Sequence, residues 1–361
     1  MSVATSRFPE LGFYLLPGHT ESPRDLASEA IEGERLGFGA AFISERFDVK
    51  EIGVMVGAAS AVTSTMSIAT AATNVNTRHP ITLAALAASA CRMSEGRFAL
   101  GLARGVGIRA SMWGLTEVDD AMLADAASLL RSLLRGERVF GHEGALGSYP
   151  YLHLADFVDE APPLLFVGFG PKSIGFAGSV FDGVVLHTFL TDDALRRSVA
   201  SVRGGAERAG RDPASVKVWS VLAVDHAQTE ESRLRKLVAR LATYLQAPAY
   251  GELLVKVNEW DPKVLESFRD HDLVAGRMNG IDSTASLDDL RSIAEAIPSE
   301  WMVAASGDAA TCAERLADQF RAGADGVILH GSTSFELAPV LEAYAAIRDS
   351  AKFASRTNRI A

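Results

Sequence analysis

The sequence is poor in cysteine, since Cys91 and Cys312 are the only two among 361 residues. They lie far apart and neither belongs to a C-x-x-C pair, so we expect two reduced thiols buried on helices rather than a disulfide or a metal site. Uninterrupted apolar runs of about 18 residues are absent, and with them the usual signature of a membrane-spanning helix. The first residues show no charged segment followed by an apolar one. We therefore expect no secretory signal and predict a cytoplasmic protein.

Basic residues are also in short supply. The formal net charge is −10, with 45 acidic residues against 35 lysines and arginines. Nonspecific binding to nucleic acid needs a basic surface, so nucleic acid is not an expected partner, and neither is a membrane. Any anionic ligand must therefore be bound by a local cationic pocket, and we expect the partner to be a small-molecule substrate.

The sequence does contain a repeated alternation of strand-length apolar runs with longer Ala- and Leu-rich segments. Residues 67–105 show it most clearly: a short apolar strand, an Arg-His-Pro turn, an Ala-rich helix and a second strand that ends in glycines. Such a β-α-β unit requires parallel strands joined by a right-handed crossover. In the turn, Pro80 is expected at the first helical position, with Arg78 and His79 fixing the turn.

The same unit recurs along the whole chain. Strands are expected at 11–17, 40–44, the start of 67–105, 98–103, 163–168, 182–187, 217–225 and 326–329. Helices are expected between them, the first at 22–36 with Ser22 as its cap. Residues 136–154 predict a hairpin, and residues 229–298 a mostly helical insertion between strands seven and eight. The pattern favours the α/β class: one (β/α)8 TIM-barrel domain over residues 1–361.

Ligand sites of such barrels lie at the C-terminal ends of the strands, which selects two glycine-bearing loops. One loop joins the fifth strand to its helix through Gly168, Phe169, Gly170, Pro171 and Lys172. Small residues and helix N-terminal amides suit a phosphate, although an ordinary tight turn explains the loop equally well. The loop after the fourth strand contains Arg104 and Gly105, with Arg104 and Arg109 as possible anion partners.

Other candidates follow the remaining strands. Glu45 and Arg46 follow the second strand, where they either pair with each other structurally or orient a substrate. His187, His226 and His330 each follow an apolar strand and are either acid–base groups or hydrogen-bonded structural residues. No His-x-x-x-His or His/Asp spacing supports a metal, so no metal site is expected.

Several segments of the chain act together as a signature. They are ERLGF at 34–38, SER at 44–46, TAATNVNTRHP at 70–80, SEGR at 94–97, LGL at 100–102, GFGPK at 168–172 and Asp182-Gly183. In joint order and spacing they resemble the luciferase-like monooxygenase family. The resemblance implies a TIM barrel that binds a flavin or the deazaflavin coenzyme F420, and a homodimer. In the deazaflavin-dependent branch a non-proline cis peptide at the end of the third strand backs the ring, and the equivalent bond here is Ala71-Ala72.

The resemblance also implies roles for individual residues. Ala71, Ala72 and Thr73 would lie at the ring, Arg104, Gly105 and the loop 168–172 at the phosphate, and Glu45, Arg46 and His187 would face the substrate as catalytic side chains. Members that oxidise a sugar phosphate carry Asp-His in place of Glu45-Arg46 and a Glu in place of Val106, so that substrate is not expected. The resemblance favours an F420-dependent oxidoreductase that transfers a hydride to or from a small organic substrate. The alternatives are an FMN-dependent monooxygenase with a partner reductase and a non-catalytic flavin- or deazaflavin-binding barrel.

Overall fold

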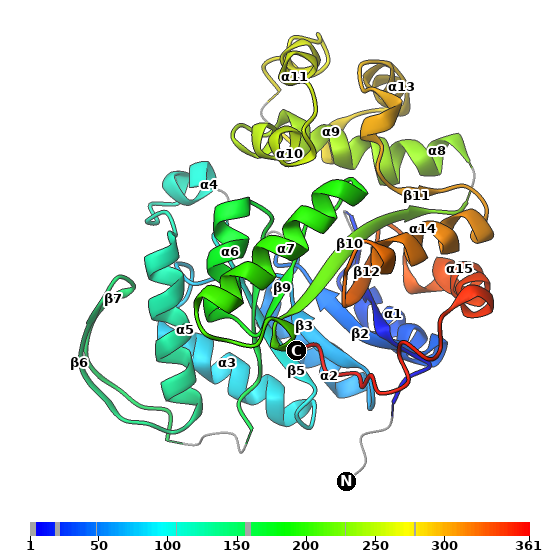
Figure 1. Cartoon of the computed structure of the whole chain (residues 1–361). Helices are drawn as coiled ribbons and strands as arrows, with labels where there is room; N and C mark the ends of the chain where they lie inside the picture. The colour runs from blue at the N-terminus through cyan, green and yellow to red at the C-terminus, as the bar shows by residue number, and fades with distance from the viewer. Residues whose placement is uncertain are drawn as a thin grey trace.

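Parallel strands alternate with helices and close into a barrel in the computed structural model, which describes residues 5–18, 22–47, 49–105, 107–155, 160–227, 229–277 and 279–361 (Figure 1). The barrel strands are β1 (Phe8–Tyr14), β2 (Phe38–Ile43), β3 (Ser67–Thr70), β5 (Phe98–Ala103), β8 (Leu164–Val167), β9 (Gly183–Val185), β10 (Lys217–Asp225) and β12 (Gly326–His330). Each pairs in parallel with the next, and β12 pairs with β1, which closes the ring. The predicted (β/α)8 barrel is confirmed.

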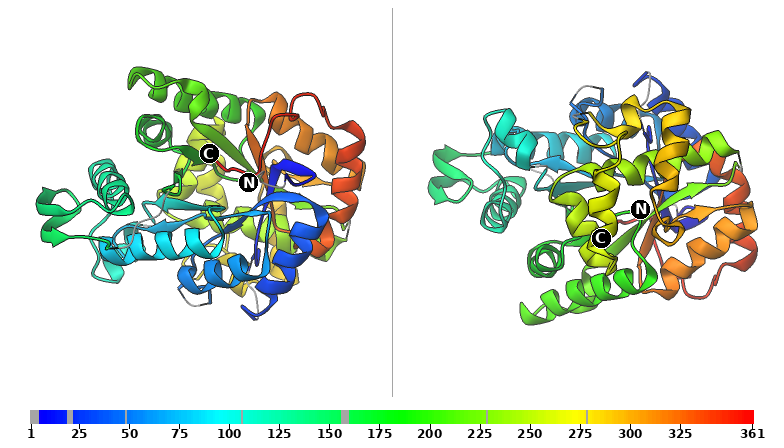
Figure 2. Two further views of the ribbon diagram at one scale, coloured as in Figure 1. Left: turned by 90° about the horizontal axis from the view of Figure 1, so that it is seen from below. Right: turned by 90° about the horizontal axis from the view of Figure 1, so that it is seen from above.

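Helices surround the barrel and cover its outer face (Figure 2). They are α1 (Asp25–Leu36), α2 (Ile52–Val62), α3 (Pro80–Met93), α5 (Asp120–Leu134), α6 (Pro171–Val180), α7 (Asp192–Arg208), α14 (Ala309–Arg321) and α15 (Ser334–Ile347). Side-chain caps define several starts: Asp119 accepts from the Met122 amide and Thr191 from the Ala194 amide, which satisfies helix donors that have no partner within the helix. Each helix buries one apolar stripe against the strands.

A second apolar cluster fills the inside of the barrel. Its side chains alternate along the strands with those that face the helices, because successive strand residues point to opposite faces. Large rings such as Phe42 and Trp219, whose centroids lie 5.1 Å apart, pack beside small residues such as Ala69 and Ala99. The Trp219 indole donates to the Ile360 carbonyl at 2.9 Å. The C-terminal segment therefore closes the N-terminal end of the barrel and leaves the opposite end for a site.

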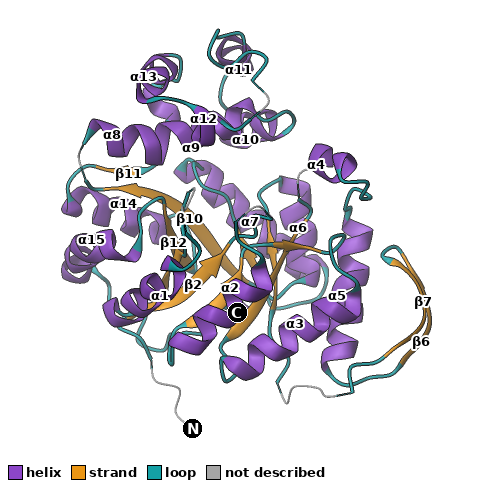
Figure 3. Cartoon of the chain, turned by 180° about the vertical axis from the view of Figure 1, so that it is seen from behind, coloured by secondary structure: helices purple, strands orange, loops and turns teal. Residues whose placement is uncertain are grey.

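Two excursions interrupt the barrel. The antiparallel strands β6 (Val139–Gly144) and β7 (Gly147–Leu152) form the hairpin predicted for 136–154, which projects from the body (Figures 1 and 3). The insertion, 229–298, is helical as predicted and lies over the C-terminal end of β10 (Figure 3). It contains α8 (Glu230–Arg233), a π-helical turn η2 (Leu234–Val238), α9 (Ala239–Gln246), α10 (Tyr250–Asn258), α11 (Pro262–Arg269), α12 (Ile281–Thr284) and α13 (Leu287–Glu295).

Short elements complete the chain: β4 (Thr73–Asn74), α4 (Gly107–Met112), β11 (Ala305–Ser306) and the 3-10 turns η1 (Pro213–Ser215) and η3 (Ser299–Trp301). Both cysteines are free and buried on helices, as predicted, Cys91 in α3 and Cys312 in α14. None of the described helices has both the length and the apolar character needed to cross a bilayer.

The predicted start of the first helix was wrong. Helix α1 begins at Asp25, and its N-cap Arg24 makes no side-chain capping bond. The Ser22 hydroxyl does accept from a backbone amide, that of Arg24 at 3.2 Å, but it does so within a turn that precedes the helix. Serine followed by proline fits both a cap and a turn, and here the turn forms.

Candidate active site

Two adjoining cavities lie at the C-terminal ends of the strands. The larger, here called the main cavity, measures about 430 Å³, and its lining includes Ala72, Arg104, Gly105, Gly168, Phe169 and His187. The smaller, the inner cavity, measures about 210 Å³, and its lining includes Tyr14, Arg46, His187, Arg240, Tyr250 and His330. Both are also lined by Val167 and Leu186, so the same side chains form a wall between them.

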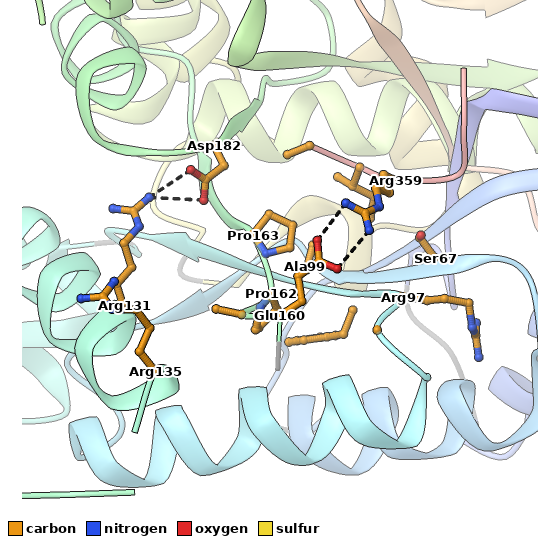
Figure 4. Close-up of a pocket in the computed structure, with 15 residues that line it drawn as sticks. Ser67, Arg97, Ala99, Arg131, Arg135, Glu160, Pro162, Pro163, Asp182 and Arg359 are labelled. Carbon is orange, nitrogen blue, oxygen red and sulfur yellow. Dashed lines mark hydrogen bonds and ion pairs between the residues drawn. The ribbon is translucent and has the colours of Figure 1, made fainter. Parts of the chain in front are cut away.

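A third cavity, also about 430 Å³, lies at the other end of the barrel (Figure 4). It is bounded by the starts of β5 and β8 and by the C-terminal segment, and the charged groups at its rim are paired. Arg131 contacts Asp182 at 3.1 Å and Arg359 contacts Glu160 at 2.8 Å (Figure 4). The N-terminal face of such barrels contributes to stability rather than catalysis. We therefore place the candidate active site in the main and inner cavities.

Glu45 forms an ion pair with Arg78, not with its neighbour Arg46. The Arg78 guanidinium contacts the Glu45 carboxylate with both terminal nitrogens, at 2.5 and 2.9 Å, and the Thr73 hydroxyl donates to the same carboxylate at 2.6 Å. The Glu45 side chain is only 3% exposed. Its backbone amide donates to the Ala72 carbonyl at 3.3 Å. Glu45 therefore joins the loops after β2 and β3 while also forming part of the main cavity wall.

The peptide bond between Ala71 and Ala72 is cis, as the family resemblance predicts. Ala72 lines the main cavity and Ala71 the inner cavity. The buried Tyr14 hydroxyl donates to the Ala71 carbonyl at 3.3 Å. Thr73 does not line either cavity among the described contacts, since its hydroxyl is turned to Glu45.

The structure brings the two predicted phosphate loops together on the main cavity. Arg104 and Gly105 line it from the loop after β5, and Gly168, Phe169 and Gly170 line it from the loop after β8. Arg104 is also paired with Asp120 of α5. Gly105 has φ +74°, a left-handed backbone that favours glycine, and a Cβ there would lie 2.2 Å from the side-chain amide nitrogen of Asn74.

The end of the second loop points elsewhere. Pro171 and Lys172 are exposed and line a shallow groove between α6 and α7 instead of the main cavity. Ser173, which the sequence reasoning did not single out, lines the main cavity in their place. Pro80 opens α3 with His79 as its N-cap, as predicted. Val106 and the side chain of Arg109 lie outside the described residues.

His187 lies in the wall between the two cavities as a neutral imidazole. Its Nδ1 donates to the Thr188 carbonyl at 2.8 Å, which leaves Nε2 as an acceptor. Its ring stacks on Phe169 at 4.6 Å and meets the edges of Tyr244 and Tyr250. Burial lowers the pKa of His187 to about 4. At neutral pH the side chain is therefore a hydrogen-bond acceptor and not a cation.

This pKa shift predicts a loss of stability in mild acid. Below the ordinary pKa of 6.5 the unfolded chain binds a proton at His187, whereas the folded chain does not until about pH 4. Stability from this group is therefore complete above pH 6.5 and falls as the pH drops toward 4. His187 alone should contribute a loss of about 2 kcal/mol in the free energy of unfolding between pH 8 and pH 5, measured as the difference between the parent and His187→Gln. Urea titrations at both pH values should show His187→Gln losing less than the parent; equal losses would contradict the assignment.

Sequence reasoning missed four residues of the inner cavity that come from the insertion and from β1. Arg240 and Tyr244 lie on α9, Tyr250 begins α10, and Tyr14 ends β1. The available signal was a charged residue, Arg240, beside the helix-spaced leucines Leu237, Leu241 and Leu245 in the insertion predicted to be mostly helical. Of the strand-end histidines, His187 and His330 line the inner cavity and His226 does not appear in its described lining. Within the described residues no cluster of His, Cys, Asp or Glu could hold a metal ion.

Comparisons with known proteins identify the family and the fold. The sequence model of the luciferase-like monooxygenase family matches residues 10–326. A 5,10-methylenetetrahydromethanopterin reductase from Methanolobus tindarius is 27% identical over 195 residues, which are 54% of this chain. The match spans 59% of that relative, less than two thirds of its length.

Solved structures share the fold. The coenzyme F420 dependent tetrahydromethanopterin reductase from Methanopyrus kandleri superposes with a TM-score of 0.73 at 18% identity, over 94% of this chain and 98% of that one. An F420-dependent secondary alcohol dehydrogenase, solved with an F420-acetone adduct, superposes with a TM-score of 0.70 at 19% identity, over 96% of this chain and 100% of that one. The oxygenating constituent of 3,6-diketocamphane monooxygenase from Pseudomonas putida, solved with FMN, superposes with a TM-score of 0.65 at 19% identity, over 96% of this chain and 98% of that one.

Proposed function

Because this chain belongs to the luciferase-like monooxygenase family, we propose that it is an F420-dependent oxidoreductase that transfers a hydride between the deazaflavin coenzyme and a small organic substrate. One observation carries the proposal: two glycine-bearing loops and the Ala72 segment meet on a single cavity of about 430 Å³. Two solved structures of the same fold that are named for F420 support the choice of coenzyme. The proposal includes the homodimer and cytoplasmic location expected from the sequence.

The residues of the main cavity suit a phosphate-bearing coenzyme. Gly170 caps α6 without a side-chain bond, and Pro171 follows at the first helical position, so later amides of this turn remain available to an anion. Arg104 adds a cation beside Gly105. Backbone at Gly105, Gly168 and Gly170 permits close approach of the ligand. When bound, the coenzyme supplies the carbon that gives or takes the hydride.

The remaining roles belong to the wall between the cavities. The Nε2 of His187 accepts a hydrogen bond from a substrate hydroxyl, because its Nδ1 is occupied by the Thr188 carbonyl. Phe169 and Tyr250 pack against His187 with ring centroids 4.6 and 5.2 Å away and exclude water from this wall. Glu45 holds the loops through Arg78, so in this proposal it positions the site, whereas Arg46 and His187 face the substrate from the inner cavity.

Coenzyme titration tests the proposal. Fluorescence titration of the purified protein should show saturable F420 binding, with FMN binding weaker. Arg104→Gln should weaken F420 binding about tenfold or more, since it removes one charge-assisted hydrogen bond. Arg135→Gln, an exposed residue paired with Glu137 away from the main cavity, should leave binding unchanged. Equal effects of the two variants would contradict the phosphate assignment.

The FMN-dependent alternative rests on the FMN-bound neighbour of the same fold. Protein purified yellow with FMN, or binding FMN more tightly than F420, would establish that alternative and exclude the deazaflavin. The third alternative, a non-catalytic binding barrel, requires F420 to bind without hydride exchange to any electron acceptor. Absorbance of the coenzyme during incubation with candidate alcohols and ketones separates this case from an enzyme.

A further inference from the structure

The inner cavity has an unusual charge balance. Its described lining includes two arginines, Arg46 and Arg240, and two histidines, His187 and His330, with the tyrosines Tyr14, Tyr244 and Tyr250. No aspartate or glutamate is among the described residues that line it. Buried arginines are ordinarily paired with carboxylates, because a charge removed from water needs a partner.

Arg240 lacks that partner. It is 6% exposed, and within the described part of the chain no carboxylate lies at ion-pair distance from it. One terminal nitrogen contacts His330 Nε2 at 3.2 Å, and the Arg240 Nε has no acceptor. Arg46, in contrast, has interactions of its own. Arg240 is therefore the cation of this cavity whose charge stays unbalanced.

The contact with Arg240 also sets the state of His330. A guanidinium only donates, so His330 Nε2 must accept and the ring proton must lie on Nδ1. That Nδ1 is buried and has no acceptor among the described residues. Burial first, and then the nearby cations Arg240 and Lys50, hold the pKa of His330 well below its usual range. His330 thus adds an unpaired donor beside an unpaired cation.

Nearby carboxylates do not restore the balance. Glu45 is paired with Arg78, and Glu336 with Lys236 at 2.5 Å. Glu29 is buried and accepts from the Leu16 amide at 2.9 Å, and burial raises its pKa to about 7, so it carries only part of a charge at neutral pH. The buried Lys50 ammonium donates to the Leu16 carbonyl at 3.0 Å. The surroundings of the inner cavity therefore favour an anion.

We propose that the inner cavity binds a carboxylate group of the substrate, with Arg240 and His330 as the donors that receive it. The identification of the occupant as substrate rests on the proposed function; the anion site itself does not. A carboxylate fits better than a phosphate dianion, because one guanidinium beside a neutral imidazole balances a single negative charge. The rest of the molecule would extend past the shared wall at Val167 and His187 toward the main cavity. The substrate class is accordingly a small organic acid.

Binding of propionate, with the uncharged propionamide as its isostere, tests this site in the protein without coenzyme. Thermal shift and tyrosine fluorescence, at constant ionic strength in chloride, should show propionate binding at least tenfold more tightly than propionamide. Arg240→Met should abolish the difference, and Arg135→Met, far from the cavity, should preserve it. Equal binding of the two compounds to the parent protein, or a preference that survives in Arg240→Met, would overturn the proposal.

The stability of Arg240→Met gives an independent readout. If Arg240 serves to bind an anion, its buried charge has no carboxylate partner in the free protein. Replacing it by an apolar side chain should therefore leave the melting temperature unchanged or raise it. A structural arginine would give the opposite result. A clear fall in the melting temperature of Arg240→Met would therefore overturn the binding role.

Repeating the propionate titration at saturating F420 separates this proposal from the proposed function. A preference for propionate in the coenzyme-free protein supports the anion site even if F420 fails to bind. If F420 binds and propionate still binds beside it, the occupant is the substrate. If F420 displaces propionate, the inner cavity holds part of the coenzyme, and the assignment to the substrate is overturned.

Discussion

Replacing Glu45 by glutamine is expected to lower the free energy of unfolding by about 3 kcal/mol. The Glu45 carboxylate is 3% exposed and accepts hydrogen bonds from both Arg78 and Thr73. In the glutamine variant the side-chain NH₂ group would face these donors, and the positive charge of Arg78 would lose one of its carboxylate partners. Breaking a buried ion pair costs roughly 3–5 kcal/mol, and the lower end applies because Glu51 still contacts Arg78 at 2.5 Å. Urea unfolding monitored by circular dichroism measures the loss.

The matched control is Glu342→Gln, which breaks an exposed pair with Arg7. Those two side chains are 67% and 50% exposed, so the expected loss is below about 1 kcal/mol. Because Glu45 joins the loops after β2 and β3, Glu45→Gln should also weaken coenzyme binding, and Glu342→Gln should not. Similar losses of stability in the two variants would show that the buried network does not hold the loops.

Replacing Gly205 by alanine should destabilise the protein by a comparable amount, about 3 kcal/mol. Helices α6 and α7 lie side by side (Figure 1) and meet at glycines. A Cβ on Gly205 would lie 1.9 Å from the Gly175 carbonyl oxygen, and one on Gly178 would lie 2.1 Å from that of Val202. Backbone atoms cannot move away as the end of a flexible side chain can, so the two helices must separate. The loss in the free energy of unfolding therefore lies at or above the usual range for overpacking.

The preceding residue supplies the control. Gly204 lies on the same helix, but its nearest contact for a Cβ is the Arg208 guanidinium at 3.1 Å, the mobile end of a long side chain. Gly204→Ala should therefore be neutral or stabilising by up to about 1 kcal/mol, the ordinary helix preference of alanine over glycine. Melting temperatures of the two variants should move apart. A similar change in both would refute close contact between α6 and α7.

The barrel was predictable because its local and global signals agree. Strand β10, Lys217–Asp225, and strand β5, Phe98–Ala103, have the predicted limits, since each is a continuous apolar run bounded by polar or turn residues. The insertion follows no such repeat. The sequence carried no start signal for its helix α10, Tyr250–Asn258, because the N-cap, Ala249, has a left-handed backbone and no capping side chain.

The site was only partly predictable, for a related reason. Glycines of the loops after β5 and β8 could be placed by the barrel rule, because strand ends meet at one face. The partner of Glu45 could not, because Arg78 lies 33 positions away and adjacency favoured Arg46. Arg240 reaches the inner cavity from α9, an element whose position over the barrel no local pattern specifies.

The insertion has a consequence for how the protein could diversify. Arg240, Tyr244 and Tyr250 enter the inner cavity from one continuous segment, whereas the glycines of the main cavity belong to the barrel's own loops. Exchange of that single segment between relatives would therefore alter what the inner cavity accepts while leaving the glycine loops intact. Recombination, natural or engineered, has here a modular unit with its boundaries near residues 229 and 298.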